Sequence, residues 1–126
     1  KGMTVLIAED NFLNMEIAEY FLEKCEAKVI KAYDGKEAVG VFEHSEPGSI
    51  AFILMDVMMP GMDGIKATKY IRALNRTDAK TIPIIAMTAK SFREDKEQCL
   101  AAGMNGHISK PIDIKEMFKV INESIV

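Results

Sequence analysis

The chain has 126 residues, long enough for one domain with a hydrophobic core and too short for two ordinary domains. Its 16 basic and 19 acidic side chains give a formal net charge of −3. This mild acidic excess argues against a nucleic-acid surface or a polybasic membrane patch. With 48% hydrophobic and 28% charged residues, the composition is that of a folded globular protein and not of a disordered one.

The sequence carries no sign of a membrane span or a secretory signal. The longest apolar run, residues 50–55, is far shorter than the roughly 20 residues of a membrane helix. Two cysteines, Cys25 and Cys99, both inside expected helices, do not indicate a disulfide framework. We therefore expect one cytoplasmic domain over residues 1–126. The start at Lys1 instead of Met indicates a piece of a longer chain.

Five short apolar runs rich in β-branched residues predict five strands. They cover residues 4–8, 28–32, 50–55, 82–87 and 106–109. The first, third and fourth runs are almost continuously apolar, as strands buried on both faces must be. The second alternates with lysine and the fifth is short and mixed, so we expect these two at the edges of the sheet.

Helical patterns lie between the runs, and several have readable ends. Asp34, Ser91 and Asp113 each precede a glutamate by three residues, the spacing of a capping box. Gly103 suits a left-handed helix end after the helix from Ser91. Apolar stripes are predicted at Met15, Ala18, Leu22 and Cys25, at Ala67, Tyr70, Ile71 and Leu74, and at Ile114, Met117, Phe118, Ile121 and Ile125.

Strand and helix thus alternate five times, which predicts an α/β domain with a parallel five-stranded sheet between two helical layers. For five strands the common doubly wound, flavodoxin-like (βα)5 arrangement has the order 2-1-3-4-5. Ligands bind such sheets beyond the carboxyl ends of the strands, between the first and third strands. The residues at those ends are therefore the candidates for function.

Carboxylates follow two of these strands. Glu9 and Asp10 come after the first, and Asp56 ends the third. Like charges brought together repel each other, so a cation is expected among them. Oxygen ligands without a nearby His or Cys favour Mg²⁺, or Mn²⁺ in its place, over zinc. Alternatively, Glu9 and Asp10 simply cap the following helix, but Asp56 is too far from the next helix start to do so.

The fourth strand ends at Thr88 and the fifth at Lys110. Taken singly, Lys110 reads as a surface lysine and Thr88 as the flank of the next helix. Together with three carboxylates on one rim, a hydroxyl and an ammonium suit phosphoryl transfer, in which positioning and charge neutralisation do most of the catalysis. Asp56 would then be the nucleophile and would form an acyl phosphate.

Four motifs in order resemble the receiver domain of bacterial two-component response regulators. The resemblance spans the whole chain and is strongest to receivers attached to hybrid sensor histidine kinases. The motifs are Glu9-Asp10-Asn11, the stretch 55–64 around Asp56, the stretch 84–89 ending in Thr88-Ala89, and Ser109-Lys110-Pro111.

The resemblance implies a role for each site residue. Asp56 would be the phosphoacceptor in a reaction that the domain itself catalyses. Glu9, Asp10 and Asp56, with the backbone carbonyl of Met58, would hold Mg²⁺. Glu9 stands where Asp is commoner in the family and reaches one methylene further. Glu26 stands where the first helix of the family usually ends in glycine, so a left-handed turn there would carry some strain.

Further residues would contact or tune the phosphoryl group. Thr88 would hydrogen-bond to it, and Lys110 would form an ion pair with it. His107 stands at the switch position, where Tyr or Phe is more usual, and is polar and titratable. It reads equally well as an ordinary edge-strand histidine. Met58 and Lys90 occupy the positions that tune phosphate lifetime, and we expect Met58 to shield the acyl phosphate from water.

The resemblance also implies partners. A phosphohistidine on a histidine kinase or a histidine phosphotransfer domain would supply the phosphoryl group. A downstream protein would bind the face formed by the helix from Ser91, the strand 106–109 and the helix after Asp113. No direct contact with nucleic acid or membrane is expected. The parent is either a hybrid sensor histidine kinase, with this domain in its cytoplasmic part, or a stand-alone regulator.

Three other functions fit part of this pattern. A receiver-like interaction domain that has lost phosphorylation would lack Asp56, Thr88 or Lys110, and all three are present. A Mg²⁺-dependent phosphatase with an aspartyl nucleophile typically carries a second Asp two residues later as general acid, where this chain has Met58. A flavin mononucleotide carrier shares the strand order, but Glu9 and Asp10 would repel its phosphate.

Overall fold

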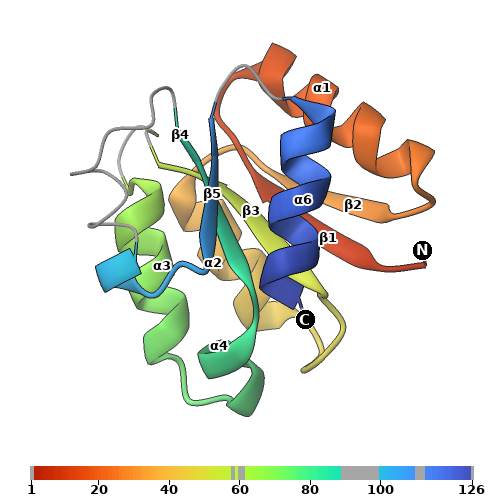
Figure 1. Ribbon diagram of the computed structural model, residues 1–126. Helices are drawn as coiled ribbons and strands as arrows, with labels where there is room; N and C mark the ends of the chain where they lie inside the picture. The colour runs from red at the N-terminus through yellow and green to blue at the C-terminus, as the bar shows by residue number, and fades with distance from the viewer. Residues whose placement is uncertain (1, 58, 60–61, 89–99, 110–112, 126) are drawn as a thin grey trace.

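The computed structural model describes residues 2–57, 59, 62–88, 100–109 and 113–125. Five strands and five helices are defined there (Figure 1). In chain order they are β1 (Thr4–Ala8), α1 (Phe12–Lys24), β2 (Lys28–Ala32), α2 (Gly35–His44), β3 (Phe52–Asp56), α3 (Gly64–Ala73), α4 (Thr77–Thr81), β4 (Ile84–Thr88), β5 (Gly106–Ser109) and α6 (Ile114–Ile125).

The strands form one parallel sheet in the order β2-β1-β3-β4-β5, which confirms the predicted fold and both edge strands. Three strands have the predicted bounds. β3 and β4 each begin two residues later and end one residue later than their apolar runs; Ile50 and Ile82 are buried but precede the strands.

Alternation along the buried strands divides the core into two layers, one on each face of the sheet. In β1, Leu6 faces one layer, which contains Phe42 of α2 and Ile71 of α3. Its neighbour Ile7 faces the other layer, with Met15 of α1 and Met117 of α6. Figure 1 shows the corresponding arrangement, with α1 and α6 on one side of the sheet and α2 and α3 on the other.

The predicted helix ends hold wherever the structure describes them. Asp34 caps α2 by accepting a hydrogen bond from the Glu37 amide (2.7 Å), and the Glu37 carboxylate accepts one from the Tyr33 amide (3.0 Å). Gly103 has φ +109°, and Glu26 adopts the left-handed region at φ +66° despite its side chain. The first residues of the helix expected from Ser91 lie outside the described residues; residues 100–102 are helical.

Two local features differ from expectation. The predicted stripe of α3 included Tyr70, which is 59% exposed; Thr68 is buried instead, and its hydroxyl donates to the Gly64 carbonyl at 2.8 Å. The short α4 was not predicted, because five residues without apolar periodicity give no helical signal. Within the described residues, no helix combines the length and apolar character needed to cross a membrane.

Candidate functional site

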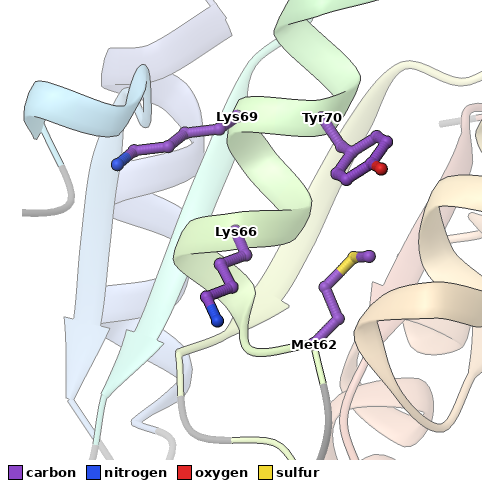
Figure 2. Close-up of a pocket in the computed structure, with 4 residues that line it drawn as sticks. All are labelled: Met62, Lys66, Lys69 and Tyr70. Atoms are coloured by element: carbon purple, nitrogen blue, oxygen red, sulfur yellow. The ribbon is translucent and has the colours of Figure 1, made fainter.

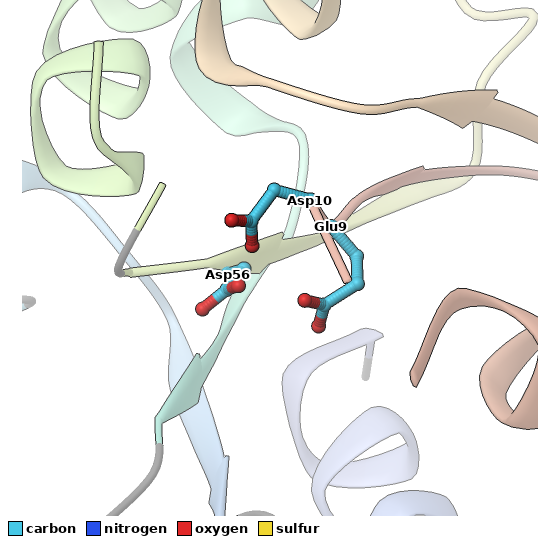
Figure 3. A group of neighbouring side chains, drawn as sticks. All are labelled: Glu9, Asp10 and Asp56. Atoms are coloured by element: carbon cyan, nitrogen blue, oxygen red, sulfur yellow. The ribbon is translucent and has the colours of Figure 1, made fainter. Parts of the chain in front are cut away.

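Three carboxylates meet at the carboxyl end of the sheet. Glu9 and Asp10 directly follow β1, and Asp56 is the last residue of the adjacent β3. One oxygen from each lies within 4.8 Å of the others. Figure 3 shows the three carboxyl groups gathered beside the end of β3. The register that pairs Ala8 with Met55 brings these residues together, as the predicted strand order required.

The cluster is asymmetric in its exposure to solvent. Glu9 is 1% exposed and Asp56 2% exposed, whereas Asp10 is exposed. Buried carboxylates close to one another carry both a desolvation cost and mutual repulsion. A fold tolerates this combination where a cation or a reacting group is to be bound.

Capping of α1 does not account for Glu9 and Asp10. The cap is Asn11, whose side-chain oxygen accepts a hydrogen bond from the Asn14 amide at 3.0 Å. Glu9 instead accepts from the Asn11 amide through Oε2 at 3.1 Å, and its own amide donates to the Ala32 carbonyl at 3.0 Å. These bonds fix Glu9 between β1, β2 and the start of α1. Sequence reasoning missed this role of Asn11, although an Asn after two acids is a readable cap signal.

The backbone around Asp56 is held closely. The Val57 amide donates to the Met87 carbonyl, and the Gly64 amide donates to the Val57 carbonyl, both at 3.0 Å. A Cβ on Gly64 would lie 2.1 Å from the Asp56 carbonyl oxygen. Only glycine therefore allows α3 to begin against the end of β3, a constraint that the sequence reading did not identify. Asp63 caps α3 by accepting from the Lys66 amide at 2.9 Å.

The other predicted site residues are described only in part. Thr88 is the last residue of β4, next but one to β1 in the sheet, and its side chain lies outside the described residues. Met58, Lys90 and Lys110 also lie outside them. His107 lies in β5, paired with Ala86 of β4, and is partly buried.

The donor set of the cluster fits a hard divalent cation. All three side chains offer carboxylate oxygens, and no His or Cys joins the group within the described residues. Mg²⁺ is typically bound through one or two carboxylates together with water and phosphate oxygens, so an exposed Asp10 beside two buried partners suits it. The fold and the cluster define a doubly wound α/β domain with an acidic site at its topological switch point.

The family comparison agrees with this class. Residues 5–122 match the response regulator receiver domain family. The chain belongs to that family, the receivers of two-component signal transduction.

Named relatives place the chain beside histidine kinases. It is 39% identical over 123 residues to hybrid signal transduction histidine kinase I of Dictyostelium discoideum. The aligned region covers 96% of this chain and 7% of that protein. A probable histidine kinase of Oryza sativa subsp. japonica is 33% identical over 99% of the chain and 14% of its own length. The chain thus spans a small part of the curated relatives that it matches.

Solved structures of receiver domains are also similar to this chain. The receiver domain of a Pseudomonas aeruginosa sensor histidine kinase, crystallised with a magnesium ion in its active-site cleft, is 35% identical with a TM-score of 0.86, covering 99% of this chain and 98% of that one. The receiver domain of the Saccharomyces cerevisiae response regulator Ssk1, co-crystallised with the histidine phosphotransfer protein Ypd1, is 32% identical with a TM-score of 0.86, covering 98% and 88%.

Proposed function

We propose that this receiver domain accepts a phosphoryl group on Asp56. The observation that carries the proposal is the cluster of Glu9, Asp10 and Asp56 within 4.8 Å at the carboxyl end of β1 and β3. Asp56 is the member that ends the central strand, on a backbone held by Met87 and Gly64. A nucleophile needs a fixed position more than it needs special reactivity, because phosphoryl transfer depends mainly on alignment and charge.

Glu9, Asp10 and Asp56, together with the Met58 carbonyl, are assigned to Mg²⁺. The magnesium ion in the cleft of the Pseudomonas relative supports this assignment, as does the all-oxygen donor set here. When bound, the ion neutralises carboxylate charge and phosphoryl-oxygen charge. Mn²⁺, with the same preference for oxygen ligands, would serve in its place.

Asp56 acts as the nucleophile. One carboxylate oxygen attacks phosphorus in line with the leaving group, so an O–P bond forms as the N–P bond of a phosphohistidine breaks. The leaving imidazole nitrogen keeps the bonding electron pair and takes a proton from solvent. The product is an acyl phosphate on Asp56 and a neutral histidine on the donor.

Thr88 and Lys110 are assigned to the phosphoryl oxygens, the first as a hydroxyl donor and the second as a cation. Support comes from their positions in the sequence at the ends of the fourth and fifth strands. Inward movement of Thr88 would leave space for His107 to reorient. Met58 would shield the acyl phosphate from water, and Lys90 would add positive charge at the mouth of the site. Met58→Asn should then shorten the phosphate lifetime, and an unchanged half-life would contradict the shielding.

The phosphoryl donor is assigned to a histidine kinase or a histidine phosphotransfer domain, in keeping with the kinase relatives and with the Ssk1–Ypd1 complex. The output is assigned to a protein that binds the face around β5 and α6. The parent is a hybrid sensor histidine kinase or a stand-alone regulator acting in the cytoplasm. Residues 1–126 are assigned to one receiver domain of that parent.

The test uses acetyl phosphate and Mg²⁺, with intact mass as the readout. The wild type should gain the mass of one phosphoryl group, and Asp56→Asn should gain none. Asp63→Asn is the matched control: it is a nearby aspartate, and asparagine still caps a helix, so this variant should be phosphorylated normally. Phosphorylation of Asp56→Asn would contradict the proposal. Sustained turnover of a phosphomonoester, without an adduct, would favour the phosphatase instead.

A further inference from the structure

Helix α3 is basic in an acidic chain. Its ten residues include Lys66, Lys69 and Arg72 and no acidic residue, whereas the whole chain has a net charge of −3. Arg72 is engaged within the fold, because its guanidinium donates to the carbonyls of Ala79 and Gly103. Lys66 and Lys69 are exposed, and neither forms an ion pair with a carboxylate in the part of the chain that the structure describes.

These two lysines border a hollow on the outer surface of α3. It has a volume of about 430 Å³ and is lined by Met62, Lys66, Lys69 and Tyr70 (Figure 2). Lys66 and Lys69 extend along one flank of the helix, and on the other flank the Met62 side chain extends toward the Tyr70 ring. The Tyr70 side chain is 59% exposed, so its ring is accessible to a partner.

The hollow is built on a rigid base. A Cβ on Gly35 of α2 would lie 2.2 Å from the Met62 carbonyl oxygen, so the backbone at Met62 is pressed against α2. The Lys66 amide is held by the Asp63 cap at 2.9 Å. A preformed surface loses little conformational entropy on binding.

We propose that this hollow, defined by Met62, Lys66, Lys69 and Tyr70, binds an acidic segment of a partner protein that presents an apolar side chain between carboxylates. The two ammonium groups complement the carboxylates and set the orientation of the segment. Tyr70 and Met62 receive the apolar side chain, as aromatic residues and methionine commonly do at the centre of interfaces. This binding is independent of phosphoryl transfer at Asp56.

Charge argues for a protein segment over a nucleic acid or an anionic membrane. Two exposed lysines on a chain of net charge −3 are too few to attract a polyanion, which is bound through many phosphate contacts. A local pairing of two lysines with two carboxylates is not subject to that limit, because it depends only on groups within a few ångströms.

The experiment is a ¹H–¹⁵N NMR titration of the phosphate-free domain with a short synthetic peptide in which glutamates flank leucine and phenylalanine. Shifts should be confined to residues around the hollow, and the affinity should fall as NaCl is raised. Replacing the glutamates by glutamine, or the leucine and phenylalanine by serine, should weaken binding. Shifts centred elsewhere, or no shifts at millimolar peptide, would overturn the proposal.

Variants locate the interaction. The double reversal Lys66→Glu with Lys69→Glu should weaken peptide binding by about tenfold or more, and Tyr70→Ala by roughly fivefold. The matched control, Lys115→Glu with Lys119→Glu on exposed positions of α6, should bind as the wild type does. All variants should still accept phosphate from acetyl phosphate, which separates loss of docking from loss of the fold. Equal weakening in the control, or self-association through α3 without peptide, would contradict the proposed occupant.

Discussion

The two ends of the sheet differ in how their charged side chains are neutralised. At the carboxyl end, three like charges lie within 4.8 Å of one another. At the amino end, where α2 and α3 finish and α4 leads into β4, two arginines contact neutral carbonyls and one carboxylate. A bound cation would reduce the repulsion among the three carboxylates, whereas the arginines find their hydrogen-bond partners within the folded chain itself. The comparison separates a carboxylate cluster whose mutual repulsion a bound cation would offset from an arginine network that stabilises the folded chain.

Arg76 joins α2 to α4 at the amino end. Its Nη1 donates to the carbonyls of Phe42, Glu43 and Ser45 at 2.7, 3.2 and 3.1 Å, so it completes the end of α2. Its other nitrogens form two hydrogen bonds with the Asp78 carboxylate at 3.0 and 2.8 Å. The guanidinium also lies 4.5 Å from the centre of the Phe42 ring.

Arg72 links α3 to the segment that precedes β5. It donates to the Gly103 carbonyl at 2.7 and 3.0 Å, to the Ala79 carbonyl at 3.1 Å and to Oδ1 of Asn105 at 2.9 Å. Asn105 Oδ1 also accepts from the Ile84 amide at 2.8 Å. Burial lowers the pKa of the Arg72 guanidinium, which stays charged and holds three elements together.

The largest effect is expected from Arg72→Ala. The change leaves the carbonyls of Gly103 and Ala79 and the Asn105 amide group without this donor, and should lower the free energy of unfolding by about 3 kcal/mol. Urea denaturation measures it. Lys69→Ala on the same helix is the control and should change stability by less than about 0.5 kcal/mol. Equal losses of unfolding free energy in the two variants would contradict a structural role for Arg72.

At the carboxyl end, Mg²⁺ should stabilise the folded domain. At about one hundred times the dissociation constant, the wild type should gain about 2.7 kcal/mol, because only the folded state gathers Glu9, Asp10 and Asp56. Asp10→Asn should lose most of this gain and, without Mg²⁺, should be at least as stable as the wild type, since one repulsive charge is gone. Thermal melts with and without Mg²⁺ measure both effects. A metal-free Asp10→Asn domain that melts well below the wild type would contradict this account.

Asp78→Asn should have a smaller effect that depends on pH. Hydrogen bonds from Arg76 hold the Asp78 pKa below its usual value of 3.8, so the carboxylate contributes stability above that pH and loses it as the pH falls through the lowered pKa. We expect a loss of about 1 kcal/mol near neutral pH, with a difference from the wild type that shrinks below about pH 4. Urea melts over this pH range provide the measurement, and a difference that grew on acidification would have the wrong sign.

The smallest effect is expected at Glu26, also at the amino end. With φ +66° it carries the strain of a left-handed residue with a side chain. Glu26→Gly should therefore stabilise the domain by about 0.5 kcal/mol, after the entropy cost of glycine is subtracted. In contrast, Glu23→Gly within α1 should destabilise it by about 1 kcal/mol. Two losses of equal size would show that the strain at Glu26 is negligible.

The carboxylate cluster at the carboxyl end of the sheet was predictable from the sequence, because each of its parts is visible in a short stretch of residues. Each buried strand is an apolar run, each acid follows such a run, and parallel connections bring the strand ends to one edge. Glu9, Asp10 and Asp56 were therefore predictable as neighbours. Their burial and the bond from the Asn11 amide to Glu9 were not, because both depend on how β1, β2 and α1 pack.

The arginine network at the amino end of the sheet was not predictable from the sequence. Arg72 and Arg76 look like ordinary charged residues in the sequence, and their partners lie up to 34 residues away. α4 is too short to show periodicity and is held by these tertiary contacts. Tyr70 was misplaced for a related reason: the buried face of α3 is centred on Ala67, Thr68 and Ile71, a rotation that composition alone does not reveal.

The most direct test of the central claim locates the phosphoryl group. The domain is phosphorylated with acetyl phosphate and Mg²⁺, reduced with borohydride, and mapped by peptide mass spectrometry, since reduction converts an aspartyl phosphate into homoserine. Phosphorylation of Asp56 should give homoserine at position 56 only. Homoserine at Asp10 or Asp63, or a phosphoryl group on His107, would contradict it.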